Sequence, residues 1–180
     1  PGSIISPQET DYIYPDVVVR KITDKWIVEL NSEVLPKVRI NSVYEGLSKR
    51  STDKSEKTYL KEHLQEAKWF IKSLQTRHDT LLKVASTIVE VQKDFLDYGP
   101  EHMKPLILSD VAQRTELHES TVSRITNRKY LSTPRGVFEL KYFFSSHLGT
   151  ASGGEISSTA IRALIKKLID EEDQTKPLSD

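Results

Sequence analysis

The sequence predicts a mainly α-helical protein with a small N-terminal β-hairpin region, one extra-long helix, a helix-turn-helix and a C-terminal amphipathic helix. Three observations lead to this prediction. Neither proline nor glycine occurs between Leu47 and Tyr98, and residues 108–128 have the apolar spacing of two short helices joined by a turn. Residues 158–170 place apolar and charged side chains at a helical period. A chain of 180 residues, 37% of them apolar, can bury a core around these elements.

The composition excludes several classes of site. The chain has no cysteine, which rules out disulfide bonds, thiolate-zinc sites and a cysteine nucleophile. Its 26 basic and 26 acidic side chains balance, so only local clustering of charge could favour nucleic acid. No apolar run approaches the roughly 20 residues that span a membrane, and the first residues lack the pattern of a signal peptide. We therefore expect a cytoplasmic protein with no membrane partner.

Nothing in the sequence indicates catalysis. The five histidines show no metal-ligand spacing, and no nucleophile motif accompanies them. The neighbours His118 and Glu119 are interpreted as the start of a helix rather than as a general base with its partner. We therefore expect a protein that is not an enzyme and that binds neither a cofactor nor a metal.

The first zone predicts short strands. A β-branched run from Val17 to Ile22 and a second run from Trp26 to Leu30 flank three polar residues, which is typical of a hairpin. The stretch "KVRIN", residues 37–41, is a candidate third strand after Pro36. Asn41 then opens a short helix that ends near Lys49.

The second zone carries the strongest structural signal. Apolar residues recur there at steps of four and three, with His78 and Gln92 as polar exceptions, which fits a heptad register over about five heptads. The seam consists of Leu60, Leu64, Ala67, Ile71, Leu74, Leu81, Ala85, Ile88 and Phe95. One helix from about Ser55 to Tyr98 is predicted, about 65 Å long. The alternative is two antiparallel helices broken near "QTRHDT", residues 75–80, where several residues are mediocre helix formers.

The third zone, "LSDVAQRTELHESTVSRITNRKYL", matches a helix-turn-helix that begins at Leu108. Ser109 is expected to cap a first helix that ends at Arg114, and the second helix is expected to run from about Glu119 to Arg128. Ala112 falls where the two helices touch. The residues expected to face inward are Val111, Leu117, Val122 and Ile125. Glu116 occupies the turn position usually filled by glycine, so the turn must adopt another conformation or accept strain.

The second of these helices leaves hydrogen-bonding side chains on its outer face, and they suit base edges and phosphates. Between Arg124 and Lys141 there are five basic residues and the single acid Glu139, so the local charge is basic. The candidate DNA-binding residues are His118, Glu119, Ser120, Thr121, Ser123, Arg124, Asn127, Arg128, Lys129 and Arg135. The alternative is a pair of helices that only packs into the protein.

The fourth zone combines a Pro134-Arg135-Gly136 turn with an aromatic-rich segment, a loop and a final helix. Gly153 and Gly154 are interpreted as a flexible loop, because no Lys-Ser/Thr pair follows and no strand leads in, as a phosphate loop requires. The amphipathic helix is predicted at residues 158–170.

The motifs "HESTVSR", "KYLSTPRGVFELKYFFSS", "GGEISSTAIRALIKKLI" and "KPLSD" resemble the sigma-54 (sigma-N) family of alternative bacterial RNA polymerase sigma factors. The similarity runs from about residue 12 to residue 180. The resemblance implies an extra-long helix at about residues 51–94 and a helix-turn-helix at 107–126, which act together at the −12 side of the promoter, where melting starts. It places Arg124 at the arginine of the recognition helix. The implied partners are promoter DNA, core RNA polymerase, and an AAA+ activator ATPase for the full-length factor.

The resemblance also suggests how the chain is divided. Residues 1–50 correspond to the end of a core-binding region, 51–98 to the extra-long helix, 105–150 to the helix-turn-helix with the aromatic-rich segment, and 151–180 to a helix and linker. The activator-responsive region and the helix that reads the −24 element are expected outside this chain, and residues 177–180 repeat the "LSD" helix opening. The alternative functions are a lac-repressor-like helix-turn-helix regulator and a coiled-coil interaction module that does not bind DNA.

Overall fold

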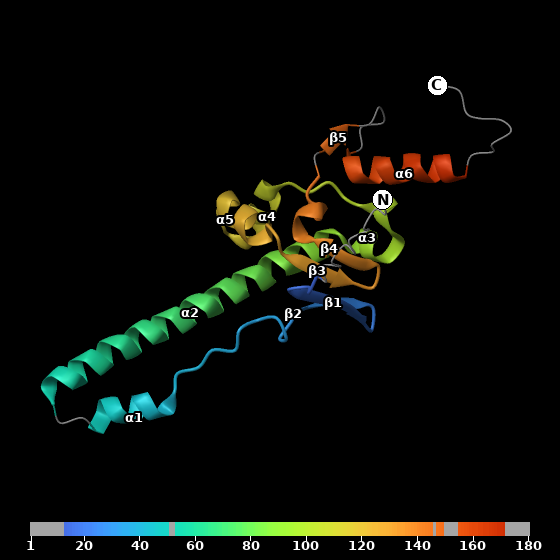
Figure 1. The fold of residues 1–180 in the computed structure, drawn as a ribbon. Helices are drawn as coiled ribbons and strands as arrows, with labels where there is room; N and C mark the ends of the chain where they lie inside the picture. The colour runs from blue at the N-terminus through green and yellow to red at the C-terminus, as the bar shows by residue number, and fades with distance from the viewer. Residues whose placement is uncertain (1–12, 51–52, 146, 150–154, 172–180) are drawn as a thin grey trace, which may run out of the picture.

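The computed structural model describes residues 13–50, 53–145, 147–149 and 155–171, and it shows a long helix that projects from a small mixed α/β body (Figure 1). The strands are β1 (Val17–Ile22), β2 (Lys25–Leu30), β3 (Tyr130–Thr133), β4 (Gly136–Glu139), β5 (His147–Gly149) and β6 (Glu155–Ser157). The helices are α1 (Ser42–Arg50), α2 (Lys54–Val91), α3 (Lys93–Tyr98), α4 (Leu108–Thr115), α5 (Glu119–Thr126) and α6 (Ser158–Asp170), with 3₁₀ turns η1 (Pro100–His102) and η2 (Leu140–Phe143). Within this described part, no helix has both the length and the apolar character needed to cross a membrane.

The predicted N-terminal hairpin is confirmed, and it forms half of a larger sheet. Strands β1 and β2 pair antiparallel, and the turn residues Thr23 and Asp24 both take positive φ angles, of 46° and 62°. Two positive φ angles are typical of the type I′ turn that two-residue hairpins favour. Strand β1 also pairs in parallel with β3, Val17 opposite Leu131, so the sheet order is β2-β1-β3-β4. The sheet therefore joins the start of the described chain to the segment after α5.

The prediction of a third strand at residues 37–41 is wrong. These residues form no strand and connect β2 to α1 in an extended course. Both sides of β1 are already occupied, by β2 and β3, and Pro36 lacks the N–H that pairing at the free edge of β2 would use. The short helix expected after Asn41 is confirmed as α1, and the Val43 N–H donates to the Asn41 side chain at 3.0 Å.

A single helix, α2, accounts for most of the predicted rod. It contains 38 residues and therefore spans about 57 Å. It continues through residues 75–80, so the alternative of two helices broken there is wrong. Asp53 caps its N-terminus, because the Asp53 carboxylate accepts the Ser55 N–H at 2.9 Å. Helix α1 packs beside the projecting end of α2 (Figure 1).

The predicted continuation of this helix to Tyr98 is wrong, because the chain leaves helical geometry at Gln92. This residue is buried, with φ −95° and ψ 25°. Its side-chain amide donates to the Lys104 carbonyl at 2.8 Å and accepts the Lys104 N–H at 3.0 Å. Heptad spacing cannot predict this feature, because the partner of the Gln92 side chain is the backbone of Lys104, twelve residues further along the chain. Helix α3 begins directly after the interruption.

The C-terminal half of α2 lies at the centre of the hydrophobic core. Val84, Ala85 and Ile88 are fully buried and belong to one cluster with the β1 residues Val17 and Val19. Helices α4 and α5 contact the same half of α2, and strand β2 contacts it as well. The long helix is therefore anchored by one half and projects with the other.

An aromatic cluster closes the core beside α3. The Phe95 ring packs edge to face on Phe138 and on Phe143, with centroid distances of 5.4 and 5.3 Å. Phe138 and Phe143 come from the aromatic-rich segment noted in the sequence. The expected turn at Pro134-Arg135-Gly136 is present, and it connects β3 to β4, two strands that the sequence did not predict. Gly136 takes a φ of 133° that favours glycine.

The predicted amphipathic helix is confirmed as α6, with the expected limits. The Ser157 hydroxyl caps it by accepting the Ala160 N–H at 3.0 Å. The glycine-rich loop at Gly153–Gly154 and the repeated helix opening at residues 177–180 lie outside the described residues.

We expect Gln92→Leu to lower the free energy of unfolding by about 2–4 kcal/mol, because it leaves both backbone groups of Lys104 without their amide partner. Urea unfolding followed by circular dichroism measures the change. Gln65→Leu, at an exposed position of the same helix, is the control and is expected to change stability by less than about 0.5 kcal/mol. Equal effects of the two substitutions would contradict this account of the helix break.

Candidate nucleic-acid interface

Helices α4 and α5 form the helix-turn-helix that the sequence predicts. Val111 and Val122 are fully buried, and Ala112 is buried where the two helices meet. Leu117 and Ile125 are half-buried and pack against the same core. The inward-facing set proposed from the sequence is therefore confirmed.

Both ends of α4 differ from the sequence interpretation. The helix begins at Leu108 rather than after Ser109, and Ile107 is the residue that precedes it. The Asp110 carboxylate accepts the Ile107 N–H at 3.2 Å, so the capping acceptor is Asp110 instead of the Ser109 hydroxyl. At the other end α4 includes Thr115, whose buried hydroxyl donates to the Val111 carbonyl at 2.6 Å.

The turn contains a strained residue. Glu116 takes φ 56° and ψ 38°, the left-handed conformation that glycine adopts without cost. From the sequence, the turn could either adopt another conformation or accept strain. The structure shows the strained case, because Glu116 has a β-carbon and still takes the left-handed conformation. The long helix supports this turn, because the Lys83 ammonium donates to the Thr115 carbonyl at 2.7 Å.

Helix α5 is shorter than predicted and ends at Thr126 instead of Arg128. Arg128 takes a φ of 53°, and its N–H donates to the Glu139 carboxylate at 2.9 Å, so the chain turns away from the helix toward β3. At the start of α5, His118 acts as the cap. Its Nδ1 accepts the Ser120 N–H at 3.2 Å and lies 2.8 Å from the Ser120 hydroxyl.

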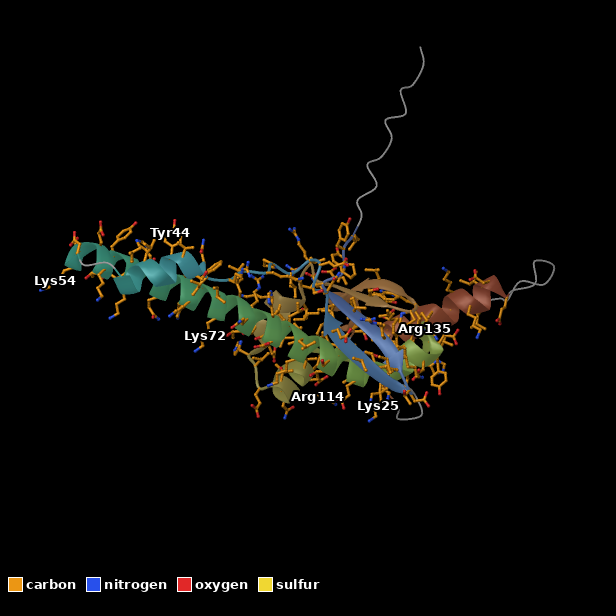
Figure 2. All side chains as sticks on the ribbon, turned by 90° about the horizontal axis from the view of Figure 1, so that it is seen from below. Lys25, Tyr44, Lys54, Lys72, Arg114 and Arg135 are labelled. Atoms are coloured by element: carbon orange, nitrogen blue, oxygen red, sulfur yellow. The ribbon has the colours of Figure 1, made fainter. Side chains whose placement is uncertain are left out.

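The structure brings most of the candidate DNA-binding residues together on and beside α5. On and beside α5, Thr121 is half-buried, and seven candidates are exposed: His118, Glu119, Ser120, Ser123, Arg124, Asn127 and Arg128. The remaining two make structural contacts. Lys129 is half-buried, and its ammonium lies 2.7 Å from the buried Asp16 carboxylate. Arg135 lies in the β3–β4 turn and donates to the Leu96 and Asp97 carbonyls at 2.8 and 2.5 Å, away from α5 (Figure 2).

A groove beside α5 contains residues that the sequence reasoning missed. It has a volume of about 460 Å³ and lies between the middle of α2 and helix α5. The lining residues are Trp69, Lys72, Ser73, Thr76, Arg77 and Thr80 of α2, with Thr121 and Ile125 of α5. Trp69 is 73% exposed. A tryptophan outside the heptad seam, followed by Lys72 and Arg77, was the signal that could have identified this surface.

The chemistry of this surface suits an anionic, planar ligand. Lys72 and Arg77 of the groove supply cations, and the Trp69 ring offers a flat face for stacking. Arg124 in α5 and Arg128 after it are further exposed cations of the helix-turn-helix. Among the described residues, no group of three or more His, Cys, Asp or Glu side chains could hold a metal ion. The arrangement fits nucleic acid.

Two family models match the chain. The model described as "Sigma-54, DNA binding domain" matches residues 57–180, and "Sigma-54 factor, core binding domain" matches residues 1–44. The chain is 58% identical over 180 residues to an RNA polymerase sigma-54 factor of Pseudomonas aeruginosa (strain UCBPP-PA14) and 60% identical to one of Acinetobacter guillouiae. All of this chain is covered in both matches, whereas it spans only 36% and 37% of the length of those relatives.

A solved structure is also similar. The crystal structure of Aquifex aeolicus sigmaN bound to promoter DNA matches 96% of this chain and 52% of its own, with a TM-score of 0.63 and 33% sequence identity.

We expect Glu116→Gly to raise the free energy of unfolding by about 0.5–1 kcal/mol, because glycine adopts the left-handed conformation without a β-carbon clash. Gln113→Gly, the same replacement in the right-handed last turn of α4, is the control and is expected to lower stability by about 1 kcal/mol. Urea titrations of both variants measure the two changes. A loss of stability in Glu116→Gly would show that the turn is not strained.

Proposed function

The chain belongs to the sigma-54 family, and from that premise we propose that it binds promoter DNA through α5 as part of an alternative sigma factor that directs core RNA polymerase to −24/−12 promoters. The observation that carries the proposal is the row of exposed donors on α5, centred on Arg124, beside a basic groove on the long helix. The protein would act in the bacterial cytoplasm, where promoter DNA and polymerase meet.

Helix α5 has the dimensions and side chains for base readout. It is eight residues long, and one face is buried through Val122 while the other carries Ser123 and Arg124 to the surface. A helix of this kind enters the major groove, where an arginine can donate two hydrogen bonds to the O6 and N7 atoms of guanine. Arg124 has the central position on this face, and Asn127 and Arg128 follow it toward the DNA backbone.

The groove on α2 extends this surface along the rod. Lys72 and Arg77 can neutralise phosphates next to the site of α5, which gives affinity without sequence preference. Trp69 offers a ring on which an unpaired base can stack. This combination supports a position at the −12 side, where the paired duplex gives way to separated strands during activator-dependent melting.

The other partners follow from the same premise. Residues 1–44, which match the core-binding model, would contact core RNA polymerase, and the full-length factor would respond to an AAA+ activator ATPase. The two sigma-54 matches favour this assignment over a lac-repressor-like regulator. A free coiled-coil module is disfavoured, because the seam residues Leu81, Ala85 and Ile88 are already buried in the protein's own core.

We expect Arg124→Ala to weaken binding to a −24/−12 promoter duplex by about 1–3 kcal/mol while leaving the thermal midpoint unchanged, because the side chain is exposed. Arg20→Ala, which removes an exposed arginine from β1, is the control. Fluorescence anisotropy on the promoter duplex and on a scrambled duplex measures the loss. A loss confined to the promoter duplex indicates base readout, and an equal loss on both indicates phosphate binding. Unchanged affinity on both duplexes would exclude Arg124 from the interface.

The groove on α2 provides a second prediction. We expect Trp69→Ala to weaken binding to a duplex with unpaired bases beside the −12 element by about 1–3 kcal/mol, because a stacking surface is lost. The adjacent Phe70 is also exposed but does not line the groove, so Phe70→Ala is the matched control. Anisotropy titrations compare both variants on the forked duplex and on the fully paired one. An effect of Phe70→Ala as large as that of Trp69→Ala would mean that the groove is not the binding surface.

A further inference from the structure

A buried carboxylate holds the segment that follows α5. Asp16 is only 6% exposed, and one of its oxygens lies 2.7 Å from the Lys129 ammonium. Its second oxygen accepts the Tyr130 N–H at 3.1 Å, and its own N–H donates to the Tyr130 carbonyl at 2.9 Å. Three contacts from one residue thus fix the chain three to four residues after α5. Asp16 itself precedes β1 and is tied to Asn31 by a backbone hydrogen bond of 2.8 Å.

A lysine of the long helix contacts the helix-turn-helix in its middle, at the last residue of α4. The Lys83 ammonium donates to the Thr115 carbonyl at 2.7 Å, at the C-terminus of α4 and directly before the left-handed Glu116. A cation at this position also interacts favourably with the negative end of the helix dipole. Thr115 is 1% exposed, so the carbonyl that Lys83 satisfies belongs to a buried residue.

These two contacts come from outside the helix-turn-helix. Packing of Val111 and Val122 sets the angle between α4 and α5 and seats the pair on α2 in one common core, and the two polar contacts add directional restraints to this packing. Lys83 of α2 contacts the last residue of α4, just before the turn that leads into α5, and Asp16 contacts Lys129 and Tyr130, three to four residues after α5. Because the chain is held both before and after this short helix, α5 has little freedom to tilt.

We propose that Asp16 and Lys83 are positioning residues that hold α5 at the angle needed to read promoter DNA, with Lys129 as the structural partner of Asp16 and not a phosphate ligand. This inference rests on the proposed DNA-binding function of α5. Asp16 lies within residues 1–44, which match the core-binding model, whereas α5 lies within the DNA-binding match. The segment related to polymerase binding thereby contributes directly to the orientation of the DNA-reading helix.

The competing explanation is that Lys129 contacts phosphate, and it predicts an opposite effect of one substitution. If Lys129 bound phosphate, Asp16→Asn would free its ammonium and remove a nearby negative charge, so DNA affinity would rise. If Asp16 positions α5, the same substitution loosens the helix and affinity falls. Asparagine keeps an oxygen that can accept the Tyr130 N–H, so the fold is expected to survive.

The experiment measures affinity and helix position in the same set of variants of the 180-residue chain. Asp16→Asn and Lys83→Met are compared with Arg20→Met, which breaks an exposed ion pair with Glu29 on the sheet and serves as the matched control. Affinity for a −24/−12 promoter duplex is measured by anisotropy. Because the chain has no native cysteine, spin labels at introduced Gln75→Cys and Ser123→Cys report the α2–α5 distance by pulsed electron paramagnetic resonance.

We expect Asp16→Asn and Lys83→Met each to weaken binding roughly tenfold and to broaden or shift the α2–α5 distance, while Arg20→Met changes neither. Higher affinity of Asp16→Asn, or an α2–α5 distance in both variants as narrow as in the parent, would overturn the proposal. Should Asp16→Asn not fold, Lys129→Met breaks the same ion pair, and an unchanged distance in it overturns the proposal equally. If the unsubstituted protein binds a scrambled duplex as tightly as the promoter duplex, the proposed function is refuted. The α2–α5 distances would still test whether Asp16 and Lys83 position α5.

Discussion

The burial of the C-terminal half of α2 is the constraint on which the rest of the structure depends. Val84, Ala85 and Ile88 are fully buried between the sheet and the helix-turn-helix, so both units share one helix as their common wall. Removing these side chains from water is the main source of stability for so small a body. The same anchoring places the middle of the rod, with Trp69 and Arg77, beside Thr121 and Ile125 of α5. Core packing thus creates the groove that we assign to DNA.

The sheet adds a second connection between the two segments that match different family domains. Strand β1 precedes residue 44 and pairs in parallel with β3, which follows α5. Val17 and Leu131, opposite each other across this pairing, are both fully buried. Because the segments that match the two models share a sheet, they cannot move independently without breaking that pairing. The structure therefore links contacts at the N-terminal segment to the position of α5 by ordinary packing.

Features with a local sequence signal were predicted well. The hairpin, the long helix, the inward set of the helix-turn-helix and α6 all arise from periodicity or turn chemistry within a short window. Features that depend on distant partners were missed. The parallel pairing of β1 with β3 joins residues far apart in the chain, and the buried amide of Gln92, where α2 ends, bonds the Lys104 backbone. Lys129 and Arg135 looked like free cations in the sequence because Asp16 and the end of α3 are distant from them in sequence.

The central claim is that α5 lies against the −12 element of promoter DNA. An iron chelate attached to a single cysteine introduced at Asn127, at the end of α5, generates hydroxyl radicals that cleave nearby DNA. Because these radicals act close to their source, the cleavage pattern on an end-labelled −24/−12 duplex locates the helix. We expect cuts within a few base pairs of the −12 element and none at −24. Cuts centred at −24, or spread evenly along the duplex, would contradict the placement of α5.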